Sequence, residues 1–205
     1  PSGFAGGHVP DRMPESYNQG QGLVMKEFQT LPDTADKYFL CLKEANGAFT
    51  DITTSVAGEK GKTGKYLLFS RTYFRKGGWY GGFTYVDLLY PGVTEKFLEI
   101  TMDSYEKHIG SEFGKTIPGV FTDEPEISSP GGIRWTPDLF DVFLEKWGYD
   151  LQTNLPSLFE EVGDWKKVRH NYTQTLLQLF IDRWAKPYYN YCEAKGLKFS
   201  GHYWE

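Results

Sequence analysis

Short apolar runs separated by glycine-rich turns dominate the first third of the chain. Two of these runs, residues 38–42 and 48–52, flank Asn46-Gly47, the dipeptide most typical of a tight β-hairpin turn. A third run at residues 65–73 is long enough for a buried strand. The pattern therefore predicts a β-rich segment at about residues 28–62, followed by one further strand.

The apolar spacing lengthens to a helical period after Pro91. It predicts helices at about residues 91–113, 136–147 and 165–194, with Pro187 kinking the last one. Short apolar runs at residues 116–122 and 197–201 predict strands between and after these helices. Helical crossovers of this length favour parallel strands, whose carboxyl-terminal loops usually carry the chemistry.

Composition narrows the class of protein. With 205 residues the chain suits one domain, and it is short for a complete eightfold barrel, which typically has about 250 residues. A hydrophobic fraction of 40% excludes a disordered chain, and no run approaches the roughly 20 apolar residues of a membrane span. The net charge of −5 gives no reason to expect a nucleic-acid partner. The 17% aromatic content suits either a sugar-binding cleft or an aromatic-rich core.

Acidic residues follow each of the last two predicted strands. Asp123, Glu124 and Glu126 follow the first, and Glu205 closes the segment after the second. Because a proline disfavours helical dihedrals in the residue before it, we expect an extended backbone at Glu124. Carboxylates that converge on one edge suit the acid/base hydrolysis of a glycosidic bond. The alternatives are a helix cap, a solvated loop, or a divalent-cation site that also includes His202.

At residues 119–125 and 198–205 the chain resembles bacterial barrel glycoside hydrolases, in particular the alpha-L-rhamnosidase-like group of glycoside hydrolase family 106. Residues 1–7, 79–82, 85–89 and 168–172 resemble the same group. The resemblance implies an α/β fold, namely part of a TIM (β/α)8 barrel with a β-hairpin region inserted at residues 28–62. Residues 1–205 would then form a single, incomplete catalytic-barrel region of a longer polypeptide.

The resemblance also implies roles for individual residues. Glu124 would be the acid/base catalyst with Asp123 beside it, and Glu205 would supply a second carboxylate. The residues expected to contact the sugar are His202, Trp79, Tyr80, Asp87, Tyr203, Trp204, Glu126 and His8. The alternative for the aromatic residues is local packing, and for Asp87 it is a helix cap.

The function implied is a glycosidase that cleaves polysaccharide side chains at alpha-L-rhamnosyl linkages. The alternatives are a non-catalytic carbohydrate-binding protein and a metal-dependent hydrolase. The substrate would be an oligo- or polysaccharide, no cofactor is required, and a bound Ca²⁺ ion is compatible with the activity. Because polysaccharides lie outside the cytoplasm, we expect a periplasmic or extracellular protein.

Overall fold

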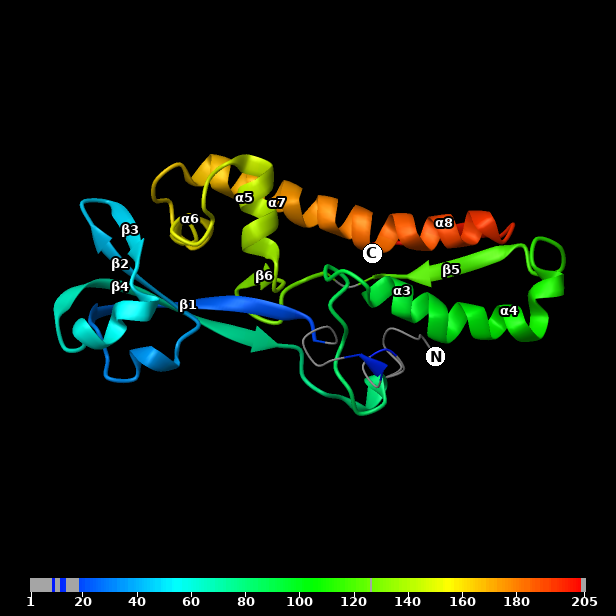
Figure 1. Cartoon of the computed structure of the whole chain (residues 1–205), viewed down its shortest axis with the longest axis horizontal. Coiled ribbons are helices and arrows are strands. Elements are labelled where there is room, and N and C mark those ends of the chain that lie inside the picture. The colour runs from blue at the N-terminus through cyan, green and yellow to red at the C-terminus, as the bar shows by residue number, and fades with distance from the viewer. Residues whose placement is uncertain (1–8, 10–11, 14–18, 126, 204–205) are drawn as a thin grey trace. The chain divides into compact units, whose positions relative to one another are not determined.

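The chain forms two compact units, which are described separately. A computed structural model describes residues 9, 12–13, 19–125 and 127–203, without the side chain of Trp79. The antiparallel unit consists of Gln21–Tyr73 and Ser129–Thr175. The parallel unit consists of Pro1–Gly20, Phe74–Ser128 and Leu176–Glu205. Both units are drawn in Figure 1.

A five-stranded antiparallel sheet forms the first of these units. Its strands are β1 (Gln21–Thr30), β2 (Leu40–Ala45), β3 (Ala48–Asp51), β4 (Thr63–Tyr73) and β6 (Ile133–Trp135), in the order β3-β2-β4-β1-β6. The predicted hairpin is confirmed, since Ala45 pairs with Ala48 across the turn. Asn46 and Gly47 have φ angles of 55° and 80°. Both are positive, as the tightest hairpin turns require.

Side chains alternate between the two faces of this sheet, and each face is covered. A buried cluster on one face includes Cys41, Tyr66 and Leu68, and it packs beneath the 3-10 helices η1 (Ala35–Lys37) and η2 (Thr53–Gly58). On the other face, Phe69 packs edge-on against Phe159 at 5.8 Å. That face is covered by α5 (Leu139–Trp147), α6 (Pro156–Phe159) and the first part of α7 (Trp165–Phe180).

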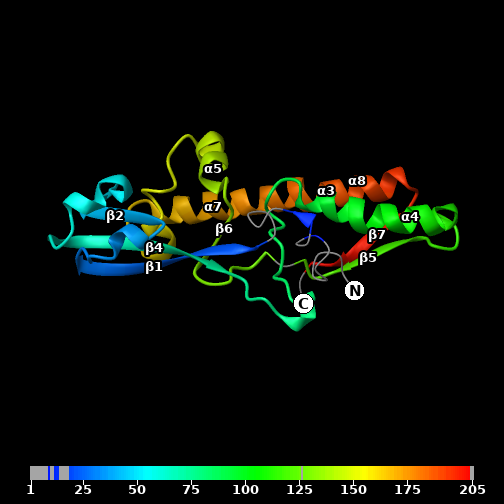
Figure 2. The ribbon, with the colours of Figure 1, turned by 60° about the horizontal axis from the view of Figure 1, so that its bottom comes forward.

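The parallel unit contains two strands and two interrupted helices. Strands β5 (Gly119–Asp123) and β7 (Lys198–His202) run side by side in Figure 2. The first helical stretch is α3 (Val93–Phe97), a π-helical turn η4 (Leu98–Met102), α4 (Asp103–Ile109) and the 3-10 turn η5 (Gly110–Glu112). The second continues α7 through a π-helical turn η6 (Ile181–Ala185) into α8 (Lys186–Ala194). A further 3-10 turn, η3 (Gly78–Tyr80), precedes the first stretch.

The helix predicted over residues 165–194 is confirmed, together with an irregularity near its proline. Pro187 lies in the first turn of α8, directly after the π-helical turn. Proline has no amide hydrogen for the carbonyl four residues earlier, and its ring crowds that carbonyl. A local widening of the helix accommodates both effects.

The predicted (β/α)8 barrel architecture is wrong. The described strands form an antiparallel five-stranded sheet and a parallel pair, and only β5 and β7 show the expected parallel crossover. In place of a barrel strand, β4 pairs antiparallel with β1, a ten-residue strand that the apolar pattern did not predict. Charged and polar residues such as Lys26, Glu27 and Gln29 occupy its second half, so its sequence lacks the apolar run by which buried strands are recognised.

Both cysteines are free and buried. Burial raises the pKa of Cys41 and of Cys192 to about 11, so both remain protonated thiols at neutral pH. Among the residues that the structure describes, no helix is long and apolar enough to cross a membrane.

One carboxylate connects strands β2 and β4 with the loop that precedes β4 in the antiparallel unit. Glu59, 20% exposed, accepts hydrogen bonds from Lys43 (2.7 Å), Lys62 (3.0 Å) and the hydroxyl of Tyr66 (3.2 Å). The hydrogen bonds from the two ammonium groups lower the pKa of Glu59 from 4.5 to about 2. The ionised form of Glu59 is therefore favoured in the folded state.

We expect this carboxylate to make stability depend on pH in the acid range. Because its folded pKa is lowered, its contribution is complete above about pH 4.5 and is lost as the pH falls to about 2. The free energy of unfolding of wild type should exceed that of Glu59→Gln at neutral pH, and the difference should vanish near pH 2. Urea denaturation at several pH values measures it, with the exposed Glu161→Gln as control. A difference between wild type and Glu59→Gln that does not change with pH would contradict this role.

Candidate functional site

The carboxyl ends of β5 and β7 bring an acidic residue and a histidine together. Asp123 and His202 are partners in the parallel register, and Asp123 Oδ1 lies 3.5 Å from His202 Nδ1. Both side chains are accessible, with exposed fractions of 74% and 48%. Register partners in a sheet project from the same face, so this pairing is set by the backbone. The expectation that these two strand ends meet is thereby confirmed.

One face of the strand pair is buried and the other is open. Phe199 of β7 packs against Trp184 and Tyr188 of the second helical stretch, at 5.9 and 4.9 Å between ring centroids. Side chains alternate along a strand, so Ser200 and His202 project from the opposite face. Phe121 and Asp123 of β5, their register partners, lie on that same open face.

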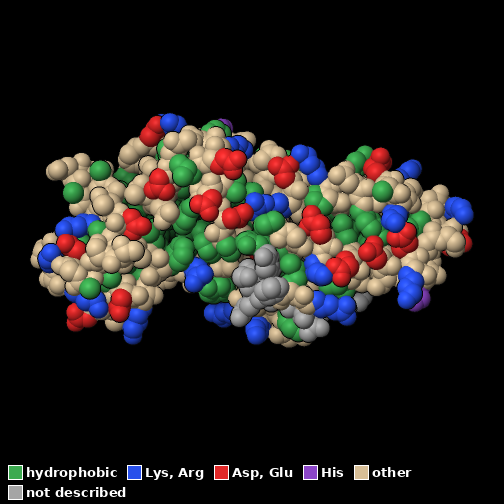
Figure 3. All heavy atoms as spheres, viewed as in Figure 1, with side chains coloured by type: hydrophobic (Ala, Val, Ile, Leu, Met, Phe, Trp, Pro, Cys, Tyr) green, Lys and Arg blue, Asp and Glu red, His purple; other side chains and the backbone are tan. Residues whose placement is uncertain are grey.

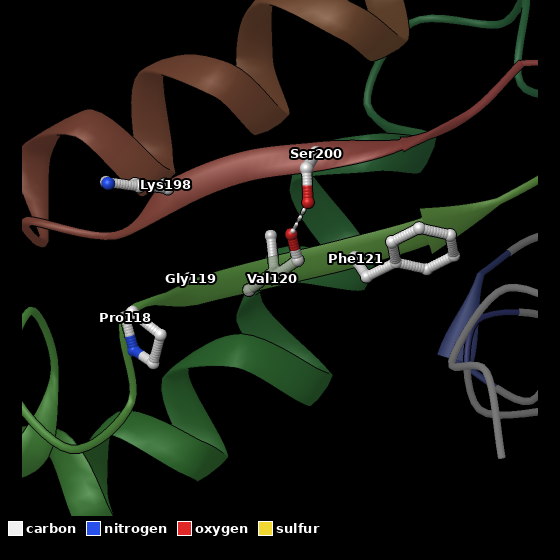
Figure 4. A pocket seen from close by; sticks show the side chains of 6 residues that line it. All are labelled: Pro118, Gly119, Val120, Phe121, Lys198 and Ser200. Carbon is white, nitrogen blue, oxygen red and sulfur yellow. Dashed lines mark hydrogen bonds between the residues drawn. The ribbon is translucent and has the colours of Figure 1, made fainter.

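An open hollow of about 300 Å³ lies beside the strand pair. Figure 4 shows the residues that line it. It is lined by Pro118, Gly119, Val120, Phe121, Lys198 and Ser200. Phe121, at one end of the hollow, is 60% exposed. Its ring meets the imidazole of His202 edge-on, with the centroids 5.1 Å apart. The exposed ring of Phe121 therefore lies between the hollow and the Asp123–His202 pair.

Glu124 has an unusual backbone conformation, which differs from the prediction. Its φ angle is +38°, in the left-handed region, where we expected an extended chain. Its amide donates a hydrogen bond of 3.1 Å to the carbonyl of His202, which extends the contact with the β7 chain one residue beyond β5. A non-glycine residue in this region costs about 1–3 kcal/mol, and such residues concentrate at functional sites. The Glu124 side chain itself is exposed.

An aromatic cluster lies beneath Tyr203, the residue that follows His202. Trp184 is fully buried and stacks on Phe180, with centroids 4.9 Å apart and an interplanar angle of 13°. Tyr203 meets both rings edge-on, at 5.9 Å from Trp184 and 6.2 Å from Phe180. Because Tyr203 is still 52% exposed, it presents a supported aromatic surface next to His202.

Two other residues predicted to contact the sugar are packed within the unit and are not exposed at the strand ends. Asp87 is fully buried, and its Oδ1 accepts a hydrogen bond of 3.1 Å from the amide of Leu89. Tyr80 is half-buried and packs edge-on against Tyr85 at 5.8 Å. Four predicted site residues lie outside the described part of the chain, namely His8, Glu126, Trp204 and Glu205. The side chain of Trp79 also lies outside the described part. Their roles stay predictions.

Phe121 and Trp184 were not singled out from the sequence as site residues. Phe121 precedes Asp123 by two positions in a strand, so the period of two would have placed both side chains on one face. Trp184 has no comparable signal, because its place beneath Tyr203 depends on the packing of η6 against β7. Among the described residues, no three His, Cys, Asp or Glu side chains are grouped closely enough to hold a metal ion.

The fold is similar to that of a solved glycosidase. The structure of a rhamnosidase from Novosphingobium sp. PP1Y aligns with 78% of this chain at a TM-score of 0.52 and 16% sequence identity. This chain spans only 17% of that protein. No family model matches the sequence, and no curated protein matches it. At this identity the likeness extends to the fold alone.

We expect the pairing of β5 and β7 to depend on Gly201. Its φ angle is +156°, and a Cβ atom there would lie 2.0 Å from the carbonyl oxygen of Thr122. Gly201→Ala should therefore lower the free energy of unfolding by about 1–3 kcal/mol. Urea denaturation followed by tryptophan fluorescence measures it.

Gly78→Ala is the matched control, because a Cβ at Gly78 meets no described atom within 4 Å. It should stay within about 0.5 kcal/mol of wild type. If Gly201→Ala proves as stable as wild type, β5 and β7 can move apart at residue 201 at little cost. The close approach at Gly201 would then not be what fixes their register.

Proposed function

We propose that this chain carries the acid/base residues of a glycoside hydrolase that acts at rhamnosyl linkages. The observation that supports the proposal most is the grouping of Asp123, Glu124 and His202 at the carboxyl ends of β5 and β7. A fold similar to that of a rhamnosidase over 78% of the chain is the second support.

Hydrolysis of a glycosidic bond needs two carboxyl groups with different tasks. One donates a proton to the glycosidic oxygen as the bond to the anomeric carbon breaks. The other attacks that carbon directly, or removes a proton from the water that attacks it. We assign the proton donor to Glu124 and the second carboxylate to Asp123 or Glu205. Glu124 suits the first task because its side chain is exposed on a backbone held in place by the bond to His202.

The remaining groups suit the binding of a sugar. The imidazole of His202 can donate or accept a hydrogen bond with a hydroxyl group, and the exposed ring of Tyr203 offers an apolar surface for the C–H groups of a pyranose. Lys and Arg side chains are interspersed with Asp and Glu over the face drawn in Figure 3. A mixed surface of this kind suits a substrate bound by hydrogen bonds and stacking. We place such a protein in the periplasm or outside the cell, where polysaccharides lie.

Carbohydrate binding without hydrolysis is the main alternative. It would be favoured if the Glu124 carboxylate were buried in an ion pair away from the strand ends, with no second carboxylate within about 10 Å. Glu124 is instead exposed, which leaves its carboxylate accessible to a glycosidic oxygen.

Replacing Glu124 tests the proposal. We expect Glu124→Gln in the full-length protein to lower kcat/KM by about 10²–10⁴-fold on an alpha-L-rhamnoside with a poor leaving group, since general acid catalysis contributes this much. With an activated aryl leaving group the loss should be much smaller, because that group departs without a proton. Steady-state hydrolysis of both substrates provides the measurement.

Glu95→Gln is a suitable control, because Glu95 is an exposed residue of α3 in the same unit. It should leave both rates unchanged. A loss below tenfold for Glu124→Gln on the poor leaving group would show that another residue is the acid. Binding of rhamnosides by a wild-type protein that hydrolyses none of them would favour the non-catalytic alternative.

A further inference from the structure

Lys198 is a cation whose charge is open to an anion at one end of the hollow. It is the one charged residue among the six described residues that line the hollow, and its side chain is exposed. Within the described part of the chain, no carboxylate forms an ion pair with its ammonium group. In contrast, Lys195 of the same unit lies 2.6 Å from Glu106. The hollow therefore has a positive end that an external carboxylate can reach.

The backbone fixes the position of Lys198 beside the hollow. Its amide donates a hydrogen bond of 2.9 Å to the carbonyl of Pro118. Its register partner is Gly119, where a Cβ atom would lie 2.9 Å from the Cβ of Lys198. A side chain at residue 119 would therefore fill the space beside the lysine, and glycine leaves that space open.

Three rows of register partners give the open face of the strand pair a polarity. Lys198 lies in the first row, Phe121 in the second, and Asp123 with His202 in the third. Figure 4 shows Phe121 and the ammonium of Lys198 at opposite ends of the drawn lining. The first and third rows are four residues apart, which is about 13 Å at the rise of a β-strand. A ligand that contacts both rows must therefore be longer than a single sugar ring.

The chemistry of the rows defines the ligand along its length. A carboxylate suits Lys198, because hydrogen bonds between charged groups are stronger than those between neutral ones. The exposed carboxylate of Asp123 would repel a second negative charge at the third row. Hydroxyl groups suit that row instead, since they can donate to Asp123 and exchange hydrogen bonds with His202. Between the two ends, the exposed ring of Phe121 offers a surface for the C–H groups of a pyranose.

We propose that the hollow is a subsite for the carboxylate of a uronic acid, which is linked to a neutral sugar held at the strand ends. The inference rests on the proposed function, since it takes the strand ends to be the place where the neutral sugar binds. It adds a requirement for an acidic sugar adjoining the neutral one. A peptide with closely spaced acidic side chains fits less well, because it would bring further negative charge to Asp123 and Glu124.

The test compares two disaccharides that differ only at C6 of one sugar. One is an alpha-L-rhamnosyl D-galacturonate, and the other is the alpha-L-rhamnosyl D-galactose of the same linkage. Titration calorimetry measures both affinities, in wild type and in Glu124→Gln alike. At low ionic strength we expect the galacturonate to bind about five- to tenfold more tightly, as one hydrogen-bonded charge pair in an open hollow would give.

Variants of Lys198 show whether its charge is the cause. Lys198→Met keeps the length of the side chain and removes the charge, so the preference should fall to about twofold or less. Lys198→Arg keeps the charge and should retain most of the preference. Lys107→Met, a matched change at an exposed lysine of α4, should leave the preference unchanged.

Ionic strength tests the inference without any variant. Salt screens exposed charge pairs, so the wild-type preference for the galacturonate should decrease as NaCl is added. The affinity for the neutral disaccharide should change little. A preference that is independent of salt would contradict a contact with the exposed Lys198.

Hydrolysis of the same two disaccharides separates the inference from the proposed function. If neither is hydrolysed but the galacturonate binds more tightly through Lys198, the proposed function fails and the inference stands. If both are hydrolysed and their affinities are equal, the proposed function stands and the inference is overturned. Binding of neither disaccharide, or a preference that survives in Lys198→Met, also overturns it.

Two control measurements complete the test. Triglutamate represents the acidic peptides, and if it binds more tightly than the acidic disaccharide through Lys198, the hollow belongs to peptides and the inference is overturned. Thermal melting followed by circular dichroism shows whether the variants fold, which we expect because the Lys198 side chain is exposed.

Discussion

The close approach of the β5 and β7 backbones is the constraint on which the candidate site depends. At Gly119 a Cβ atom would lie 2.3 Å from the carbonyl oxygen of Lys198, and at Gly201 it would lie 2.0 Å from that of Thr122. Glycine is therefore the residue type that fits at both ends of the pair. The register that results places Asp123 beside His202.

Packing against the helices determines which face of the β5–β7 pair is buried and which is open. The rings of Trp184 and Tyr188 bury one face through Phe199, and the exposed side chains of Phe121, Asp123 and His202 project from the other. The same Trp184 supports Tyr203 from beneath. A single buried tryptophan in a π-helical turn thus contributes both to the core and to the orientation of the site, which is consistent with the frequent occurrence of such turns near functional residues.

Elements with local causes were predicted well from the sequence, and the pairing of β4 with β1 was not. The Asn46-Gly47 hairpin follows from two residues that adopt positive φ readily. The break ahead of Pro187 follows from a missing amide hydrogen. The antiparallel partner of β4 lies some forty residues earlier along the chain, in a strand without a clear apolar run. No local pattern reveals such a partner, so this antiparallel pairing was not predicted.

The sequence by itself determined the Asn46-Gly47 hairpin, the helix over residues 165–194, and the position of Asp123 and His202 at the ends of two strands, because turn residues and apolar periods act over a few positions. Only the tertiary structure decided that Asp123 faces His202, that Phe121 remains exposed beside them, and that Glu124 adopts a left-handed conformation. These features depend on the register between two strands separated by more than seventy residues. That register is set by backbone hydrogen bonds and close packing at glycines.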